Sequence, residues 1–344
     1  MSFTHFSLGG SAYEIGLGLG RFGRDAVHRH LRVLPLWQHL TSLVGSEAAR
    51  TLRATVERRF PQYWAEFEGL AAGLELPLEE VFLWNCRGDF VQRQSVDGCT
   101  TVLGPTDSGT LIAHNEDGFP QLRGHCALVS VTPEQGQGFT SFVYPGSIPG
   151  HTFAVNAKGL VVTVNNIRPQ AIPTGLPRQV LGRASLDATS IDEAVDILAS
   201  AGRAGAFHHA LGQAGSTRLV SVEATSGGAS VVEVERPYGH SNHLVHPALG
   251  AVEQRITGSS GNRQRCVDDL LVGLGERLDG GQALAILRDT SGGDLPVYRC
   301  APDDPDDENT LATALFRIGA DTVDWAVYTE TDTRHPTLSG QVVV

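Results

Sequence analysis

A short stretch about a third of the way along the chain has the residues of a self-activating nucleophile. Asp97-Gly98-Cys99-Thr100-Thr101 places a cysteine between a glycine and two threonines. If the Cys99 thiol attacks the carbonyl of Gly98, the peptide bond shifts to a thioester, which water hydrolyses to leave Cys99 as a new N-terminus. Gly98 suits this step because a residue without Cβ can expose its carbonyl to the next side chain. The alternative is that Cys99 is a small core residue, the commoner use of cysteine.

A new N-terminus at Cys99 would supply its own base. A free α-amine titrates at about 7.7 to 8 and a thiol near 8.5. Near neutral pH the amine can therefore take the thiol proton and later return it to a leaving group. Nucleophile and base would then be carried by one residue.

The cysteines and histidines give no sign of a metal site. The 344 residues include five scattered cysteines, without the paired spacing of a zinc site or the density of a disulfide scaffold. His208 and His209 are adjacent, so in a strand they point to opposite faces. We therefore expect no metal, no cofactor and a reducing, cytoplasmic environment. The cysteines are Cys86, Cys99, Cys126, Cys266 and Cys300.

Charge and hydrophobicity exclude several classes of partner. The net charge is -12 and Lys158 is the one lysine, which disfavours nucleic acid because phosphate backbones select for clustered positive charge. A cationic or neutral substrate is easier to attract than an anionic one. The first residues lack a basic segment followed by an apolar one, and no apolar run approaches the roughly 20 residues of a membrane span. We expect neither secretion nor membrane insertion.

The chain ahead of Cys99 has a helical pattern. It begins at Ser11 and Glu14, which have capping-box spacing, and continues to about Cys86. Expected helices cover residues 31–43, 46–59, a segment from 61, and 78–84. Glycines at 18, 20 and 23 imitate a dinucleotide-binding pattern, but no strand is expected before them, so nucleotide binding is disfavoured.

After Cys99 the pattern changes to short strands separated by turns. This change predicts a layered α+β sandwich, with residues 1–98 as a helical segment and 99–344 as the catalytic part. The acidic stretch Asp303–Glu308 lacks the spacing of a calcium loop and is expected to be a solvated surface loop. Expected strands cover 100–103, 110–114, 127–131, 140–144, 152–155, 160–164, 208–211, 219–223, 230–234, 311–318 and 323–328, and expected helices cover 178–186, 191–201, 261–274 and 282–287.

Several motifs spread along the chain resemble one enzyme family. The match is to the cysteine N-terminal-nucleophile (Ntn) hydrolases of the isopenicillin N acyltransferase and N-β-alanyl-dopamine hydrolase type. Its order and spacing cover nearly the whole chain. The motifs are Tyr13-Glu14-Ile15-Gly16, Asp97 to Thr101, His114-Asn115-Glu116-Asp117, Gly150-His151-Thr152 leading through Asn156 and Gly159 to Asn165, Asn242-His243, and Asp289-Thr290-Ser291-Gly292-Gly293.

This resemblance implies a fold, a maturation step and a set of roles. It implies the αββα four-layer sandwich of Ntn hydrolases and cleavage between Gly98 and Cys99, with the N-terminal fragment kept as a small subunit. Asp117 would position the cysteine and its amine, and Asn242 would supply the oxyanion-hole amide. Asn165 would be a further site amide; the alternative is an asparagine that caps a strand end.

Departures from the family pattern bear on the substrate. Glu116 stands where the penicillin enzyme has tryptophan, so an aromatic wall is replaced by an acid that could bind a substrate amine. The fungal enzyme has an arginine just before the position of Thr310, which puts an anionic acyl donor in doubt here. Arg299 is the nearest guanidinium that could substitute, and the alternative is an ordinary surface arginine. Thr100, beside the nucleophile, is the remaining substrate-binding candidate.

Three functions follow from these residues. The first is hydrolysis of a linear amide, such as a β-alanyl or other aminoacyl amine, through a Cys99 acyl-enzyme. The second is acyl transfer, in which an amine acceptor resolves the thioester in place of water. The third is an uncleaved binding protein that keeps the fold without catalysis. A small-molecule amide is the expected partner, and a homo-oligomer is left open.

Overall fold

The computed structural model describes residues 3–90, 98–331 and 333–344. Asp97, the first residue of the predicted nucleophile motif, lies outside these ranges. The helices within them are α1 (Ala12–Ala26), η1 (Val27–Leu31), α2 (Pro35–Thr41), α3 (Glu47–Arg59), α4 (Pro61–Leu74), α5 (Leu78–Asn85), α6 (Arg87–Phe90), η2 (Pro120–Leu122), α7 (Arg178–Ser185), α8 (Ile191–Ala199), η3 (Pro247–Leu249), α9 (Gly258–Val272) and α10 (Gly280–Leu287).

The strands form two sheets. They are β1 (Thr4–Gly10), β2 (Cys99–Pro105), β3 (Thr110–Gly118), β4 (Ala127–Pro133), β5 (Phe139–Val143), β6 (Phe153–Asn156), β7 (Leu160–Ile167), β8 (Ala206–Gln213), β9 (Leu219–Thr225), β10 (Gly228–Glu233), β11 (Tyr238–His240), β12 (Asn309–Ile318), β13 (Thr322–Tyr328) and β14 (Leu338–Val343). The eight-stranded sheet has the order β1-β4-β5-β6-β7-β8-β9-β10, and the six-stranded sheet has the order β11-β2-β3-β12-β13-β14.

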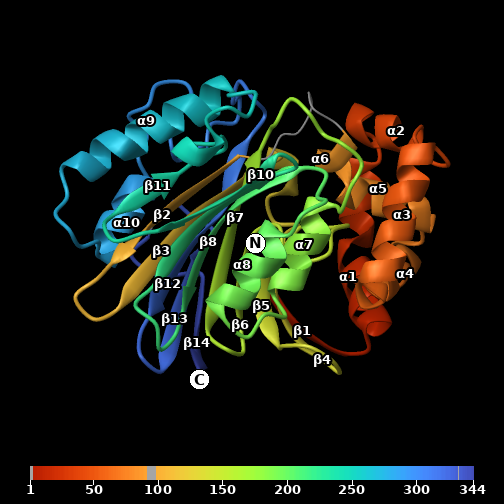
Figure 1. Ribbon diagram of the computed structural model, residues 1–344, viewed down its shortest axis with the longest axis horizontal. Helices are drawn as coiled ribbons and strands as arrows, with labels where there is room; N and C mark the ends of the chain where they lie inside the picture. The colour runs from red at the N-terminus through yellow and green to blue at the C-terminus, as the bar shows by residue number, and fades with distance from the viewer. Residues whose placement is uncertain (1–2, 91–97, 332) are drawn as a thin grey trace.

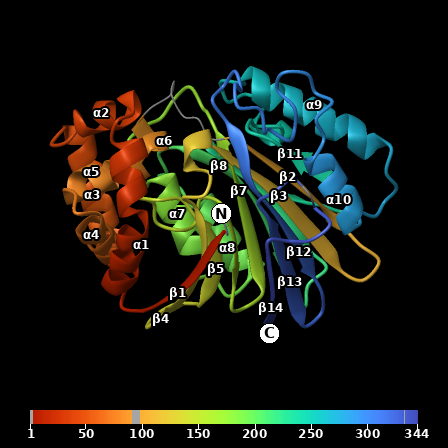
Figure 2. The same cartoon turned by 180° about the vertical axis from the view of Figure 1, so that it is seen from behind.

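The two sheets pack face to face between layers of helices. β2 contacts β7 and β9, and β3 contacts β8, so the sheets share an inner face. α8 packs on β8 to β10, whereas α10 packs on β2, β3 and β12, and α9 packs on β11. Figures 1 and 2 show α9 and α10 on one side of the sheets and the helices α1 to α6 beyond the other side. This arrangement confirms the expected α+β, αββα four-layer sandwich with an N-terminal helical segment.

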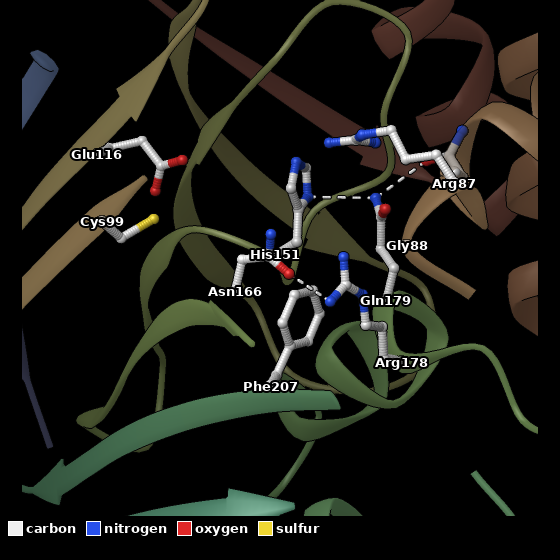
Figure 3. A pocket seen from close by; sticks show the side chains of 10 residues that line it. Arg87, Gly88, Cys99, Glu116, His151, Asn166, Arg178, Gln179 and Phe207 are labelled. Carbon is white, nitrogen blue, oxygen red and sulfur yellow. Dashed lines mark hydrogen bonds between the residues drawn. The ribbon is translucent and has the colours of Figure 1, made fainter. Parts of the chain in front are cut away.

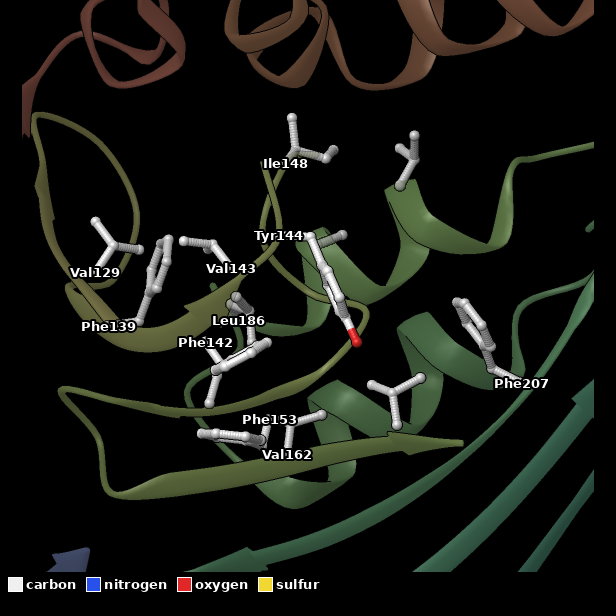
Figure 4. Packing of buried hydrophobic residues seen from close by; sticks show 14 of the residues in the cluster. Val129, Phe139, Phe142, Val143, Tyr144, Ile148, Phe153, Val162, Leu186 and Phe207 are labelled. Carbon is white, nitrogen blue, oxygen red and sulfur yellow. The ribbon is translucent and has the colours of Figure 1, made fainter. Parts of the chain in front are cut away.

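The apolar core lies mainly around the eight-stranded sheet. Phe142 and Phe153 pack with ring centroids 5.2 Å apart, and Tyr144 meets Phe142 edge-on at 5.4 Å (Figure 4). Edge-on and tilted pairs are the preferred aromatic geometries. This packing fixes Tyr144, whose hydroxyl reaches the neighbourhood of Cys99.

The N-terminal segment contains a β-strand as well as helices. β1 was not expected, yet it pairs in parallel with β4, with Thr4 opposite Ala127, and forms an edge of the eight-stranded sheet. The expected capping box between Ser11 and Glu14 is present at the start of α1. A buried ion pair of 3.0 Å between Glu66 on α4 and Arg183 on α7 joins the helical segment to the rest. Residues on both sides of position 98 therefore share one sheet and one core.

The glycine-rich stretch packs helix against helix. A Cβ on Gly16 of α1 would lie 2.0 Å from the Glu66 carbonyl oxygen, and one on Gly69 of α4 would lie 1.9 Å from the Tyr13 carbonyl oxygen. The glycines thus let the backbones of α1 and α4 approach closely, which is a packing role. Nucleotide binding was disfavoured because no strand was expected before these glycines. That expectation was wrong, since β1 precedes them.

Most other expected elements are present, with a few differences. The single helix expected over 31–43 is interrupted before Pro35, since proline cannot donate the amide hydrogen bond of a helix interior. β11 and β14 were missed: β11 has three residues, and β14 is an edge strand with alternating, largely exposed side chains. None of the helices in the described ranges combines the length and apolarity needed to cross a bilayer.

Candidate active site

Cys99 is the first residue of β2, where strand pairing sets its neighbours. β2 runs antiparallel to β3, and this register places Cys99 opposite Glu116. Cys99 is only 3% exposed. It lines a pocket together with Glu116 on β3 and residues of α5, α6, α7, β7 and β8. The lining residues are Asn85, Arg87, Gly88, Cys99, Glu116, His151, Asn166, Arg178, Gln179 and Phe207.

The peptide bond between Gly98 and Cys99 is held at both ends. Its carbonyl oxygen accepts a hydrogen bond of 2.9 Å from the Asp117 backbone N–H. Its nitrogen donates a hydrogen bond of 2.9 Å to Asn242 Oδ1. The residues predicted to serve cleavage and catalysis therefore contact the very bond that cleavage would break.

Space explains why residue 98 is glycine. A Cβ at Gly98 would lie 2.7 Å from Glu308 Oε2 and 3.2 Å from Asp117 Oδ2. The first of these distances is shorter than a carbon and an oxygen normally approach, so alanine would displace a carboxylate. Two acids thus crowd the carbonyl side of the predicted cleavage point.

The Asp117 carboxylate is oriented by the neighbouring strand. β12 pairs with β3, and Thr310 opposite Asp117 donates 2.7 Å from its hydroxyl to Oδ1. Oδ2 is buried and has no hydrogen-bond partner among the described residues. An oriented carboxylate oxygen next to Gly98 is placed to accept from an amine that forms there.

Asn242 follows β11 and has a fixed amide orientation. Its Oδ1 accepts from the Cys99 nitrogen and, at 2.6 Å, from Arg263 Nη2. Two donors on one atom identify that atom as the oxygen. Nδ2 is then a buried donor without a partner among the described residues. A buried amide donor beside a nucleophile is the arrangement that stabilises an oxyanion.

Arg263 was missed by sequence reasoning. It lies on α9, is 1% exposed, and donates to the Cys99 carbonyl oxygen, to Thr100 Oγ1 at 2.9 Å and to Asn242 Oδ1. Ser259, one turn earlier on α9, accepts from its Nε. A single arginine in a helical pattern carries no local signal of such contacts. Arg263 joins the nucleophile strand to Asn242, which makes it a positioning residue.

Substitution of Arg263 is expected to slow catalysis without greatly changing substrate affinity. Arg263→Met keeps much of the side-chain length but leaves Asn242 free to rotate. Hydrogen bonds to charged groups contribute about 1.5–3 kcal/mol, so kcat should fall roughly 10- to 100-fold while KM changes little. Steady-state kinetics of the variant check this, with Arg265→Met, an exposed neighbour on the same helix, as the control. A rise in KM alone would argue against a positioning role.

Glu116 lies next to Cys99 and is buried. Its Oε1 accepts 2.9 Å from the Tyr144 hydroxyl, and its Oε2 is 3.2 Å from His114 Nε2. Glu116 therefore does not face solvent. It lines the pocket beside Cys99.

Asn165, one of the predicted catalytic residues, lies behind the pocket. Asn165 lies on β7. Its Oδ1 is hydrogen-bonded to the Thr101 hydroxyl and to His208 Nδ1, and its Nδ2 donates to the His240 carbonyl. It does not line the pocket, whereas its neighbour Asn166 does, because successive residues of a strand face opposite sides. The strand-capping alternative is also wrong, since Asn165 lies inside β7.

The other substrate-binding candidates are also enclosed. Thr100 is buried and accepts from Arg263, so its hydroxyl faces α9 and not the pocket. Arg299 is 1% exposed and not a surface arginine; it pairs with Asp304 and Glu308 and donates to Ser259 Oγ at 2.8 Å. Burial opposes its charge, but the nearby carboxylates hold the Arg299 pKa above its usual value.

The acidic loop is therefore partly internal, contrary to expectation. Asp304 and Glu308 turn inward to surround Arg299, while Asp303 and Asp307 are exposed. Burial raises the pKa of Glu308 to about 7, against the lowering effect of Arg299. A buried arginine between two carboxylates fixes the loop against Gly98 and Asp117.

The pocket has more basic than acidic side chains, although the chain as a whole is acidic. Figure 3 shows Cys99 and Glu116 together at one end of the pocket and Arg87 and Arg178 at the other. Burial lowers the pKa of His151, between them, to about 3, so it is neutral. The net charge of -12 favours cationic substrates in general, but this pocket has two guanidinium groups and one carboxyl group.

Two solved structures, a hydrolase and an amidase, have a partial likeness to this chain. A variant of conjugated bile acid hydrolase from Clostridium perfringens has a TM-score of 0.46 and 10% identity, covering 71% of this chain and 92% of that one. The Caenorhabditis elegans ortholog of N-acylethanolamine-hydrolyzing acid amidase has a TM-score of 0.42 and 12% identity, covering 63% and 92%.

Two curated relatives share sequence with this chain. The β-alanyl-dopamine/carcinine hydrolase of Drosophila melanogaster is 28% identical over 220 residues, which cover 56% of either chain. The 40 kDa form of acyl-coenzyme A:6-aminopenicillanic-acid-acyltransferase of Emericella nidulans is 27% identical over 230 residues, covering 65% of this chain and 64% of that one. The chain thus spans between half and two thirds of the length of these relatives.

The family assignment rests on a family model that matches more than half of the chain. The model of the acyl-coenzyme A:6-aminopenicillanic acid acyl-transferase family covers residues 105–331, from the end of β2 to beyond β13. This range contains Asp117, Asn242 and Arg263, three of the groups that surround Cys99. The protein belongs to the acyl-coenzyme A:6-aminopenicillanic acid acyl-transferase family, as the motifs around Cys99 and Asp117 predicted.

Proposed function

We propose that the chain cleaves itself between Gly98 and Cys99 and then hydrolyses a linear amide through a thioester on Cys99. The observation that carries this proposal is the double contact on the Gly98–Cys99 peptide, with Asp117 on its oxygen and Asn242 on its nitrogen. Family membership, and relatives named as a hydrolase and an acyltransferase, support the same chemistry.

Self-cleavage needs a thiol, a polarised carbonyl and water. Cys99 Sγ bonds to the Gly98 carbonyl carbon, and the bond from that carbon to the Cys99 nitrogen breaks. The thiol proton ends on this nitrogen, which becomes the α-amine. The Asp117 N–H, 2.9 Å from the Gly98 oxygen, stabilises the negative charge that develops there. Water then hydrolyses the thioester, which restores the thiol and leaves Gly98 as a carboxylate.

Turnover would use the same groups in new roles. The freed α-amine takes the thiol proton as Cys99 attacks the substrate carbonyl and returns it to the leaving amine. Asn242 Oδ1 stays an acceptor for that amine, and Nδ2 donates to the substrate oxyanion. Asp117 Oδ2 is placed to orient the amine. Water finally releases the acyl group from Cys99.

The N-terminal fragment would remain bound after cleavage. β1 is paired along the whole length of β4, and the Glu66–Arg183 ion pair is buried. Tyr63 also donates 2.7 Å to Asp187 across the same boundary. These contacts do not depend on the Gly98–Cys99 bond, so the fragment acts as a small subunit of one integrated fold.

We further propose that the acyl group carries an amine, as in a β-alanyl amide. The β-alanyl ammonium is close to the carbonyl carbon, so it reaches groups beside Cys99, where Glu116 lies. Arg87 and Arg178, at the other end of the pocket, would repel it. The Drosophila relative is named for β-alanyl-dopamine and carcinine, which agrees with this choice.

Competition between two matched amides tests amine recognition. Wild-type enzyme is expected to prefer a β-alanyl amide over its propionyl counterpart in kcat/KM by more than about fivefold, because a desolvated pair exceeds the ~1 kcal/mol limit of exposed pairs. Glu116→Gln should remove most of this preference. Equal values of kcat/KM in wild type would exclude amine recognition, and a preference unchanged by Glu116→Gln would assign it to a different acid.

Acyl transfer to an amine acceptor is the second candidate. The burial of Cys99 favours it, because a thioester shielded from bulk water survives until an acceptor binds. The family and the Emericella relative are also named for acyl transfer. Product analysis with and without an added amine acceptor separates the two reactions.

The intact mass of purified wild-type protein tests the whole proposal. We expect two chains, of residues 1–98 and 99–344, that stay together in native conditions and separate in denaturant. N-terminal sequencing of the larger chain should begin at Cys99. Full-length protein that hydrolyses amides without cleavage would contradict the proposed mechanism.

A further inference from the structure

Three side chains at the nucleophile bring their ligand atoms to one point. Cys99 Sγ, a ring nitrogen of His114 and a Glu116 oxygen lie within 4.8 Å of one another, and all three residues are buried. The β2–β3 register places Cys99 opposite Glu116, and His114 precedes Glu116 by two residues on the same face of β3. The cluster spans two strands, which is why the spacing of cysteines in the sequence did not reveal it.

The hydrogen bonds fix which nitrogen of His114 carries a proton. Asn165 Nδ2 donates to the His240 carbonyl, so Asn165 Oδ1 is an acceptor and must receive the single hydroxyl proton of Thr101, 2.7 Å away. His114 Nδ1 lies 2.8 Å from the same hydroxyl oxygen and therefore donates to it. In a neutral ring, Nε2 is then an unprotonated acceptor.

Nε2 of His114 faces a second acceptor. Glu116 Oε2 lies 3.2 Å away, a hydrogen-bond distance between two atoms that both offer lone pairs. A shared proton joins the two atoms in the metal-free protein, and a metal ion can take the place of that proton.

We propose that Cys99 Sγ, His114 Nε2 and Glu116 Oε2 form a Zn²⁺ site whose fourth position opens to the pocket. Thiolate, imidazole and carboxylate are the donors that zinc takes. Metal–ligand distances of about 2.0–2.3 Å put the ligand atoms of a tetrahedral site roughly 3 to 4 Å apart, close to the spacing here. Cys99 and Glu116 both line the pocket, which provides an entry path and room for water.

The charge of the cluster and the hydrogen bonds to its ligand side chains are compatible with a bound dication. Zn²⁺ displaces the thiol proton and the proton between His114 and Glu116, so two protons leave as two charges arrive and the net charge of the buried cluster is unchanged. Thr101 holds the His114 tautomer that exposes Nε2, and the Tyr144 hydroxyl orients Glu116 through Oε1. Such outer partners usually accompany a metal ligand set.

A metal in this site would silence the nucleophile. Ligation ties up Sγ, so zinc would block both the attack on Gly98 and the attack on a substrate, and a chelator would restore them. The metal would thus be a reversible inhibitor and not part of the reaction. Binding needs only the three side chains, so it is independent of whether the protein cleaves itself.

Titration with Co²⁺, a spectroscopic substitute for Zn²⁺, tests the site directly. In metal-free wild-type protein we expect one Co²⁺ per protein, with tetrahedral visible bands and a sulfur-to-cobalt charge-transfer band that Zn²⁺ abolishes. The charge-transfer band should disappear in Cys99→Ala. Thr101→Val and Tyr144→Phe, which retain all three ligands, should weaken Co²⁺ binding about 10- to 100-fold.

Controls separate this site from the other thiols. Cys300→Ser and Cys266→Ser remove the two most accessible alternative thiols and should leave the titration unchanged. Circular dichroism melting curves verify that each variant is folded. No sulfur-to-cobalt band in wild type, a band that persists in Cys99→Ala, or equal affinity in wild type and Thr101→Val would each overturn the assignment.

Discussion

Cys99→Ala is expected to remain a single chain of full mass, however long it is incubated. Alanine fills the same buried position with less volume, so the fold should persist while the attacking sulfur is absent. Loss of a catalytic nucleophile typically costs on the order of 10⁶ in kcat, so amide hydrolysis should fall to background. Intact-mass spectrometry over the maturation period, followed by an amide hydrolysis assay, checks both outcomes.

Cys86→Ala is the matched control for this experiment. Cys86 is also buried and also lies close in sequence to the cleavage point, but it does not line the pocket. This variant should cleave and turn over like wild type. Cleavage that persists in Cys99→Ala would exclude Cys99 as the nucleophile, and wild-type protein that stays whole, binds amides and hydrolyses none would favour the binding-protein alternative.

Local patterns were enough to predict the strands that carry the nucleophile. The change from helical to alternating periodicity placed a boundary near Cys99, and β2 begins at that residue. Asp117 was predicted beside Cys99 by family resemblance, and the β2–β3 pairing shows the physical reason: antiparallel neighbours bring the end of β3 back to the start of β2.

The residues that sequence reasoning missed act through tertiary contacts. Arg263 is one arginine in a helix, and Arg87 and Arg178 begin two others, so none of them has a local pattern that marks it as part of the pocket. A surface position was the alternative given for Arg299, because arginines usually lie there, but two carboxylates of the loop that follows it, Asp304 and Glu308, enclose it. Spacing alone does not tell which acids of a loop turn inward to pair with a buried arginine.

The missed strand β1 illustrates the same limit. Its side chains alternate between exposed and partly buried, and it joins the sheet by pairing with β4 more than a hundred residues later. A short edge strand followed by a well-capped helix is easily absorbed into a helical segment. Its presence changes the view of residues 1–98, because a segment that supplies a strand to the core sheet cannot leave without exposing that sheet's edge.

Asn242→Ala is expected to lower kcat by about 10² to 10³, or roughly 2.7–4 kcal/mol of transition-state stabilisation. Nδ2 is a buried donor without a partner among the described residues, and Arg263 holds it in that orientation by bonding Oδ1. Such a donor costs little to preorganise and gains its partner only when the oxyanion forms. The loss should therefore appear in kcat, with little change in KM.

Self-cleavage should slow in the same variant for a different reason. Asn242 Oδ1 accepts from the Cys99 nitrogen, which is the leaving group of the cleavage step, whereas the Gly98 oxygen is bonded by Asp117. Asn242→Ala therefore removes the acceptor of the Cys99 nitrogen but keeps the Asp117 N–H that donates to the Gly98 oxygen. The rate of self-cleavage should fall less than kcat. Kinetics on the fully cleaved fraction of Asn242→Ala, with thermal melting to verify its fold, separate the two effects. Unimpaired turnover in that fraction would remove Asn242 from the oxyanion site and leave the Asp117 N–H as the donor that serves both reactions.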